Sequence, residues 1–223
     1  MRRGACSAGA VVLAALTSGC GSSSHNAAST KASTASAPAS SSSQAAIPPG
    51  APAAVRELAG RMLVAGDLPG LAPSGKRSIG INAAGWVAEQ GLPAAEREKR
   101  VRTLERLGFM KAVSERLTAS PETGPEALSV AIEFGSPRSA RVYVRDEVRS
   151  SRAHGAGAFT VTGIPGAKGF GGKFGPTVGY NVAFAKRNFY YLVGVGYPAG
   201  APGAPTRQQL ITAARRLDAR VRH

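Results

Sequence analysis

Residues 178–197, VGYNVAFAKRNFYYLVGVGY, decide the fold more than any other stretch of this 223-residue chain. Val, Tyr and Phe occupy every second position as far as Phe184, and the same alternation resumes at Phe189. A period of two is typical of β-strands that bury one face. Between the two runs, Asn188 tolerates the left-handed backbone conformation that tight turns need. The stretch therefore predicts an antiparallel hairpin that turns at Lys186-Arg187-Asn188.

The segments around this hairpin show helical and strand periodicities in turn. Apolar residues spaced three and four apart predict helices, and a period of two predicts strands. Ser136-Pro137 is a helix N-terminus, and Thr206 with Gln209 forms a capping box. The helices are expected at 52–63, 93–107, 136–148 and 206–221, with a short helical turn after Asn82, and further strands at 109–117, 128–134 and 159–164.

Consecutive strands joined by short connections favour an antiparallel sheet. The expected fold class is α+β, with a sheet of about five strands, helices packed mainly on one face, and the order ααββαβββα. In such a sheet Tyr190, which alternates with Tyr191, would lie on the open face. Residues 51–223 have the length of a single globular domain.

The N-terminus carries an export signal. Arg2 and Arg3 precede a short apolar run, and small residues follow it up to Gly19. The apolar core is about nine residues, far fewer than the roughly twenty that span a bilayer as a helix. Residues 1–19 are therefore predicted to be a secretory signal peptide.

The sequence Leu16-Thr17-Ser18-Gly19-Cys20 resembles the lipobox of bacterial lipoproteins. The resemblance implies that Cys20 becomes the mature N-terminus and carries a diacylglyceryl thioether with fatty acyl chains such as palmitate. Two chains make a stable anchor where one is marginal. The expected location is the outer face of the cytoplasmic membrane, with the membrane contacted through lipid on Cys20. Cys6 lies in the removed segment and lipid would occupy Cys20, which is the other cysteine. No disulfide is therefore expected.

Residues 20–50 are mostly Ser, Ala and Thr, and contain no acidic residue. Such a composition cannot bury enough apolar surface to offset the entropy of ordering. The segment is therefore predicted to be a disordered, lipid-anchored tether, and thirty flexible residues would reach roughly 30 Å in root-mean-square terms.

The folded part is strongly basic. Residues 51–223 hold 25 of the 28 Lys and Arg and all 13 Asp and Glu, a net charge of +12. A field of this sign attracts polyanions without specifying one. Outside a membrane the possible partners are anionic lipid, glycan or wall polymer, besides another envelope protein. No nucleic-acid partner is expected, because the export signal removes the chain from it and no nucleic-acid motif is present.

Residues that carry chemistry are few. Among the three histidines only His154 could lie in a site, and it has no His or Cys companion at ligand spacing. Asp67 is predicted to cap a turn, whereas Asp146 and Asp218 are predicted to lie on the solvent-exposed sides of helices. No Gly-x-Ser-x-Gly elbow is present. We therefore expect no catalytic residue, no metal site and no cofactor.

Residues 163–176 contain six glycines and two lysines. The alternatives are a tightly turned connection between strands, or a loop that presents backbone N–H groups and charge to an anion. Lys168, Lys173, Lys186 and Arg187 are the candidate anion-binding residues. The strand, the sequence Ile-Pro-Gly-Ala at 164–167 and the hairpin loosely resemble extracytoplasmic lipoprotein and sensor-like domains of actinobacteria. That resemblance implies a non-catalytic role in the envelope.

These patterns favour a lipid-anchored cell-envelope protein of non-enzymatic, binding or structural type, in contact with anionic envelope components. Two alternatives stay open at this point. One is a small extracytoplasmic enzyme that acts on wall polymer, and the other is an accessory or sensor domain for a membrane protein.

Overall fold

The structure, a computed structural model, describes residues 53–119 and 124–221. The predicted signal peptide, Cys20 and the predicted tether lie outside the described residues. In the part that is described, no helix is both long enough and apolar enough to cross a membrane.

Helices and strands mix along the chain, as the α+β class predicts. The helices are α1 Ala53–Ala59, α2 Ala83–Ala88, α3 Ala94–Arg106, α4 Pro137–Ala153 and α5 Arg207–Arg220. The strands are β1 Ala72–Gly80, β2 Phe109–Thr118, β3 Glu126–Phe134, β4 Gly157–Phe159, β5 Lys168–Phe174, β6 Thr177–Lys186 and β7 Phe189–Pro198.

All seven strands form one sheet in the order β1-β2-β3-β7-β6-β5-β4. Every neighbouring pair is antiparallel, so the predicted strand direction is confirmed. The sheet is larger than the expected five strands because β1 and β5 were not anticipated. The predicted strand at 159–164 is wrong in extent, since only Gly157–Phe159 pairs, at the edge of the sheet.

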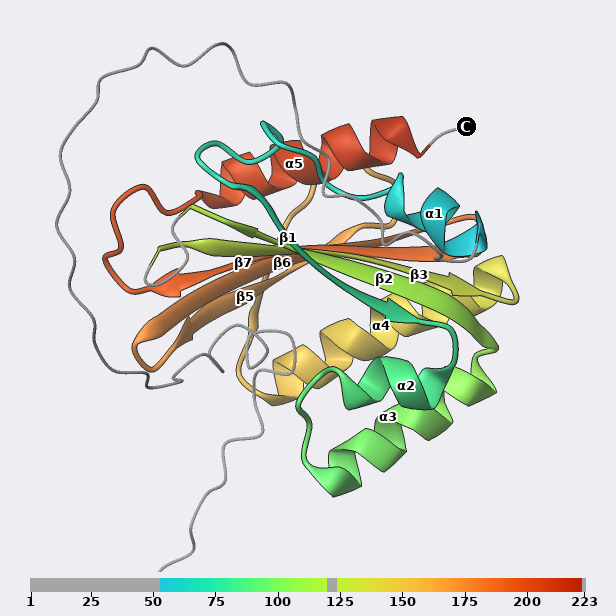
Figure 1. Ribbon diagram of the computed structural model, residues 1–223. Coiled ribbons are helices and arrows are strands. Elements are labelled where there is room, and N and C mark those ends of the chain that lie inside the picture. The colour runs from blue at the N-terminus through green and yellow to red at the C-terminus, as the bar shows by residue number, and fades with distance from the viewer. Residues whose placement is uncertain (1–52, 120–123, 222–223) are drawn as a thin grey trace, which may run out of the picture.

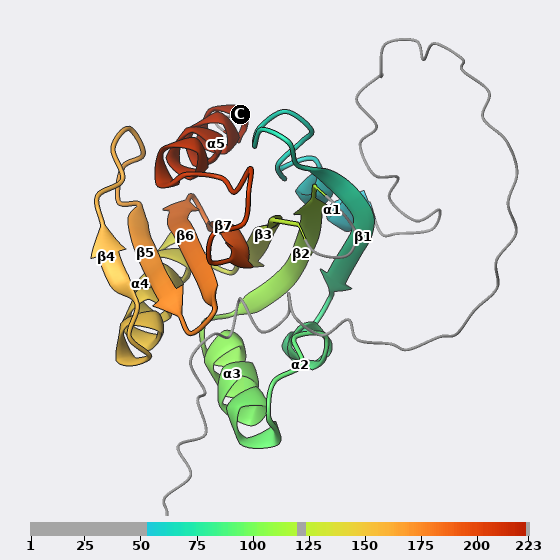
Figure 2. The same cartoon turned by 90° about the vertical axis from the view of Figure 1, so that its left-hand side faces the viewer.

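Helices cover both faces of the sheet, which corrects the expectation of one covered face (Figures 1 and 2). One apolar layer lies under α1 and α5 and contains Phe184, Tyr191 and Val193. The other lies under α2, α3 and α4 and contains Ile132, Tyr190 and Leu192. Tyr190 is therefore not on an open face: it is 2% exposed. Central strands that are buried on both sides need apolar residues at consecutive positions.

The predicted hairpin of residues 178–197 is present, with Lys186 paired to Phe189 across a two-residue turn. The residue with positive φ is Arg187, at 53°, and not Asn188 as predicted. Asn188 serves the turn differently, because its side-chain Nδ2 donates to the Phe134 carbonyl and to Glu133 Oε1, both at 3.1 Å. The turn is thus fixed to the end of β3.

The predicted helix starts at Asn82, Ser136 and Thr206 are confirmed. Each of these side chains accepts a hydrogen bond from the backbone N–H three residues later, and Gln209 completes the capping box. The first helix is shorter than predicted and ends at Ala59. Met62 and Leu63 lie beyond it and are still 1% exposed, because the chain that follows α1 packs down on the sheet.

Half of the glycine-rich segment 163–176 forms strand β5, although its composition suggests a loop between strands. Glycine is required at two places because other groups approach the backbone. A Cβ on Gly169 would lie 2.3 Å from the Phe159 ring, and one on Gly171 would lie 2.1 Å from the Gly179 carbonyl oxygen. Glycine in a strand therefore marks close approach here, and not a loop.

Candidate functional site

The charged residues fall into two groups: those that make contacts inside the fold and those that are exposed at its surface. Glu115 of β2 belongs to the first, with a fully buried side chain that binds Arg77 of β1 at 3.0 Å. Ser129 of β3 lies beside Glu115 in the register, and its hydroxyl accepts the Leu63 backbone N–H at 3.1 Å. These residues form a buried polar row beneath the segment that follows α1.

A second buried pair joins two helices on the other face of the sheet. Arg100 of α3 donates to Glu147 of α4, and its guanidinium lies 5.4 Å from the centre of the Tyr143 ring. Tyr143 meets Tyr190 edge to face at 4.8 Å. Burial raises the pKa of both tyrosines above the ordinary value, and the charge of Glu147 adds to this while Arg100 opposes it. Arg100 turns inward to Glu147, whereas Arg102 of the same helix pairs with Glu98 at the surface.

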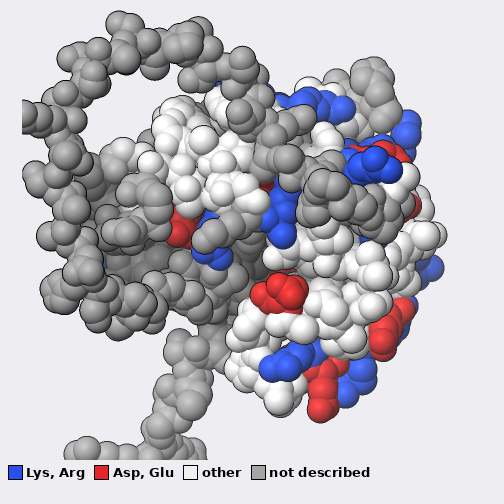
Figure 3. Space-filling model, viewed as in Figure 1, with Lys and Arg blue, Asp and Glu red and all other residues white. Residues whose placement is uncertain are grey.

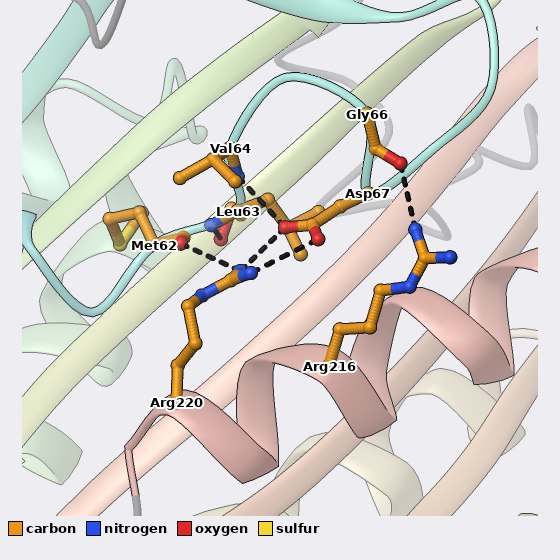
Figure 4. Close-up of polar contacts among 8 residues, drawn as sticks. Met62, Leu63, Val64, Gly66, Asp67, Arg216 and Arg220 are labelled. Atoms are coloured by element: carbon orange, nitrogen blue, oxygen red, sulfur yellow. Dashed lines mark hydrogen bonds and ion pairs between the residues drawn. The ribbon is translucent and has the colours of Figure 1, made fainter. Parts of the chain in front are cut away.

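Helix α5 is fastened to the chain between α1 and β1 by two arginines (Figure 4). Arg220 binds Asp67 with two hydrogen bonds, at 2.5 and 3.0 Å, and also donates to the Met62 carbonyl. Arg216 donates to the Gly66 carbonyl at 2.8 Å. Asp67 caps the turn as predicted, since it accepts the Val64 backbone N–H. A two-point arginine–carboxylate contact fixes orientation as well as distance.

The remaining contacts of α5 are also internal. Arg207 stacks on Tyr180 at 4.5 Å and donates to its hydroxyl, and Arg215 donates to the Thr162 carbonyl at 2.7 Å. Asp218 was predicted to be wet but is 3% exposed and binds Lys186 at 2.6 Å. The basic residues of α5 therefore hold the fold together, and do not form a simple solvated face.

The four predicted anion-binding residues do not come together. Lys168 pairs with Ala183 and Lys173 with Val178, near opposite ends of β5. Lys186 lies on the α5 side of the sheet, where it binds Asp218, and Arg187 is exposed in the hairpin turn. Anion binding by the exposed members stays a prediction, but the structure offers no single site that contains all four.

Helix α4 presents the group of charges that the sequence reasoning missed. Its outer face carries five exposed arginines, spaced three or four residues apart: Arg138, Arg141, Arg145, Arg149 and Arg152. At about 100° per residue this spacing places them in one line, opposite the buried Ala140, Tyr143 and Val144. We call these five residues the α4 arginine stripe. The spacing was visible in the sequence once an inward face had been assigned.

The stripe is almost free of acidic partners. Arg149 lies 3.5 Å from Asp146, and within residues 53–119 and 124–221 the other four arginines form no ion pair. Helix α3 differs, since acidic and basic side chains are mixed over its surface (Figure 3). There, Glu98 pairs with Arg102. The stripe therefore concentrates positive charge along one helix, whereas the surface of α3 carries both signs.

Groups for catalysis or metal binding are sparse in the described part of the chain. His154 is exposed at the end of α4, and its ring Nδ1 lies 2.7 Å from the Ser150 carbonyl oxygen. Among described residues, no three His, Cys, Asp or Glu side chains gather as a metal site would require. The buried carboxylates of Asp67, Glu115 and Glu147 are each engaged by an arginine.

Comparison with known proteins gives one loose likeness. The structure is similar to the extracellular domain of PknH from Mycobacterium tuberculosis, with a TM-score of 0.44 and 11% sequence identity. The matched region covers 69% of this chain and 86% of that one. No protein-family model and no curated protein matches the sequence.

Proposed function

We propose that this chain is a lipid-anchored protein of the cell envelope, of non-enzymatic, binding or structural type. Lipid on Cys20 holds it to the outer face of the cytoplasmic membrane, and its folded domain contacts anionic envelope components. The observation that carries the binding role is the α4 arginine stripe, a row of exposed cations on a helix whose other face is fully used by the core. The lipobox-like sequence supports the location.

The state of the carboxylates supports a non-enzymatic role. A carboxylate that acts as a general acid or base must be able to change its protonation during the reaction. Asp67, Glu115 and Glu147 instead lie in close ion pairs that connect separate elements, which is the work of structural residues. His154 is exposed and lies on the helix end, where its ring contacts a backbone carbonyl.

The anchor is tested by expressing the full chain and its Cys20→Ala variant in a bacterium that processes lipoproteins. We expect the unaltered chain in the membrane fraction, with the mass of a diacylglyceryl group on the N-terminal peptide. The variant should lose this mass, because position 20 no longer carries a thiol that can form the thioether. Unmodified Cys20 on protein in the cytosol would overturn the proposal.

The alternative that the protein is an enzyme acting on wall polymer is tested separately. If the purified chain releases soluble fragments from isolated cell wall, and His154→Ala abolishes the release, the protein acts on wall polymer. A control variant with an exposed arginine altered on α3, Arg106→Gln, separates this result from a general loss of wall binding through reduced charge. We expect no release from either variant or from the unaltered chain.

A further inference from the structure

We propose that the α4 arginine stripe is a membrane-contact surface, along which the domain lies on the anionic phospholipid headgroups of the bilayer that anchors it. The inference rests on the proposed function, because the anchor supplies the membrane. It specifies the partner of the stripe and the orientation of the domain. Helix α4 would lie parallel to the bilayer, with the sheet above it.

The geometry of the stripe suits a flat partner. From Arg138 to Arg152 the helix rises about 21 Å at 1.5 Å per residue. The helix has no break along this length. Arginine side chains in one line on a straight helix can reach a planar layer of phosphates together, and guanidinium groups bind phosphate oxygens at two points. A flexible wall polymer needs no such alignment.

The packing of the opposite face of α4 prevents the arginines of the stripe from turning into the domain. Tyr143, Val144 and Glu147 are buried between α4 and the sheet or α3. The helix therefore cannot roll to bury its arginines within the domain without losing this packing. The five guanidinium groups therefore stay on the outer side of the domain. Apart from Asp146, which lies near Arg149, an anionic partner for them would come from outside the domain.

With the predicted tether, a weak affinity of the stripe for the membrane is enough to keep the domain on its surface. A domain held within roughly 30 Å of a membrane meets it at a high effective concentration, on the order of millimolar for short flexible linkers. Each arginine close to an anionic leaflet strengthens binding by about fivefold. The stripe therefore needs no apolar insertion to keep the domain on the surface, and salt should weaken the contact.

The test uses the full chain with Cys20→Ala, so that no lipid contributes, and sedimentation with vesicles. Phosphatidylcholine vesicles measure whatever the apolar N-terminus contributes, and vesicles that also contain phosphatidylglycerol measure the contribution of charge. The stripe variant replaces Arg138, Arg141, Arg145 and Arg152 with Gln. The matched control replaces Arg56, Arg97, Lys99 and Arg106 with Gln, which removes the same charge from four exposed positions outside α4.

We expect binding only to the anionic vesicles, weaker at about 0.15 M salt than at low ionic strength. The stripe variant should lose affinity on the order of 600-fold, given about fivefold for each of its four arginines. The control should lose far less. A variant with Lys at the same four stripe positions should retain most of the binding. Circular dichroism and thermal melting of every variant show whether it is folded.

Equal binding by the folded stripe and control variants would overturn the proposal, since net charge alone would then explain the attraction. Binding to isolated wall polymer but not to anionic vesicles would also overturn it, in favour of a wall partner. Neither result depends on the anchor, because Cys20 is absent from every protein compared. The anchor and the surface can therefore fail independently.

Discussion

Glu115 shares its ion pair with Arg77 of the neighbouring strand, and the two side chains are 0% and 7% exposed. One oxygen of Glu115 and the Nε of Arg77 find no hydrogen-bond partner among the described residues. The charges were removed from water and are only partly compensated, so each depends strongly on the other. At the residue scale, this pair is a place where a small change has a large effect.

Replacing Glu115 with Gln should lower the free energy of unfolding by about 3–5 kcal/mol, because the positive charge of Arg77 remains buried without its partner. The double variant Glu115→Leu with Arg77→Met should recover most of this loss. Chemical denaturation measures both changes.

The matched control is Glu98→Gln, which breaks the pair with Arg102 on α3. Those side chains are 72% and 69% exposed, and exposed pairs contribute within about 1 kcal/mol. A loss at Glu98 as large as that at Glu115 would contradict the distinction between buried and exposed pairs.

At the scale of elements, β5 shows how composition can conceal a strand. Its sequence KGFGGKF has the glycine content of a loop, yet it pairs with β6 along its whole length and with β4 over residues 169–171. Edge strand β1 was concealed in a similar way, by Pro73, Gly75 and a register shift between Pro73 and Arg77. In both strands the periodic pattern of side chains is weak, and pairing with a neighbour supplies the order instead.

Two adjacent glycines of β5 give a direct test. Gly171→Ala should destabilise the domain by more than about 2 kcal/mol, since the new Cβ meets the Gly179 carbonyl and φ is 150°. Gly172→Ala should be nearly neutral, because no atom lies within 4 Å of its Cβ position. Thermal melting of the two variants measures the difference. Equal melting temperatures would show that the segment is not packed as a strand.

At the scale of the whole molecule, the sheet separates two apolar layers, and each layer is closed by its own helices (Figure 2). Tyr143 and Tyr190 lie in the layer under α4, where burial raises the pKa of both. Their hydroxyl groups therefore report whether that layer is intact.

The stability of the domain should fall as the pH rises above about 10, where an ordinary tyrosine ionises. In this range the unfolded chain loses protons that Tyr143 and Tyr190 keep in the folded state, so the free energy of unfolding decreases with pH. Absorbance of tyrosinate during an alkaline titration should show these two groups ionising together with unfolding. Their ionisation in the folded protein, before the loss of ellipticity, would contradict this expectation.

The sequence by itself determined the local features of this protein. Alternating apolar residues predicted the β6–β7 hairpin, and the capping residues Ser136 and Thr206 predicted where α4 and α5 begin. These features depend on neighbours a few positions away, so a single stretch of chain contains the necessary information. The spacing of the α4 arginine stripe was equally local.

Only the tertiary structure decided which charges are internal and how the sheet is covered. Asp218 and the arginines of α5 have the pattern of a wet helix face, but their partners Lys186, Gly66 and Asp67 are distant in sequence. The second covered face placed Tyr190 in the core for the same reason. Burial and ion pairing depend on what lies opposite in space, and the periodicity of one segment cannot specify that.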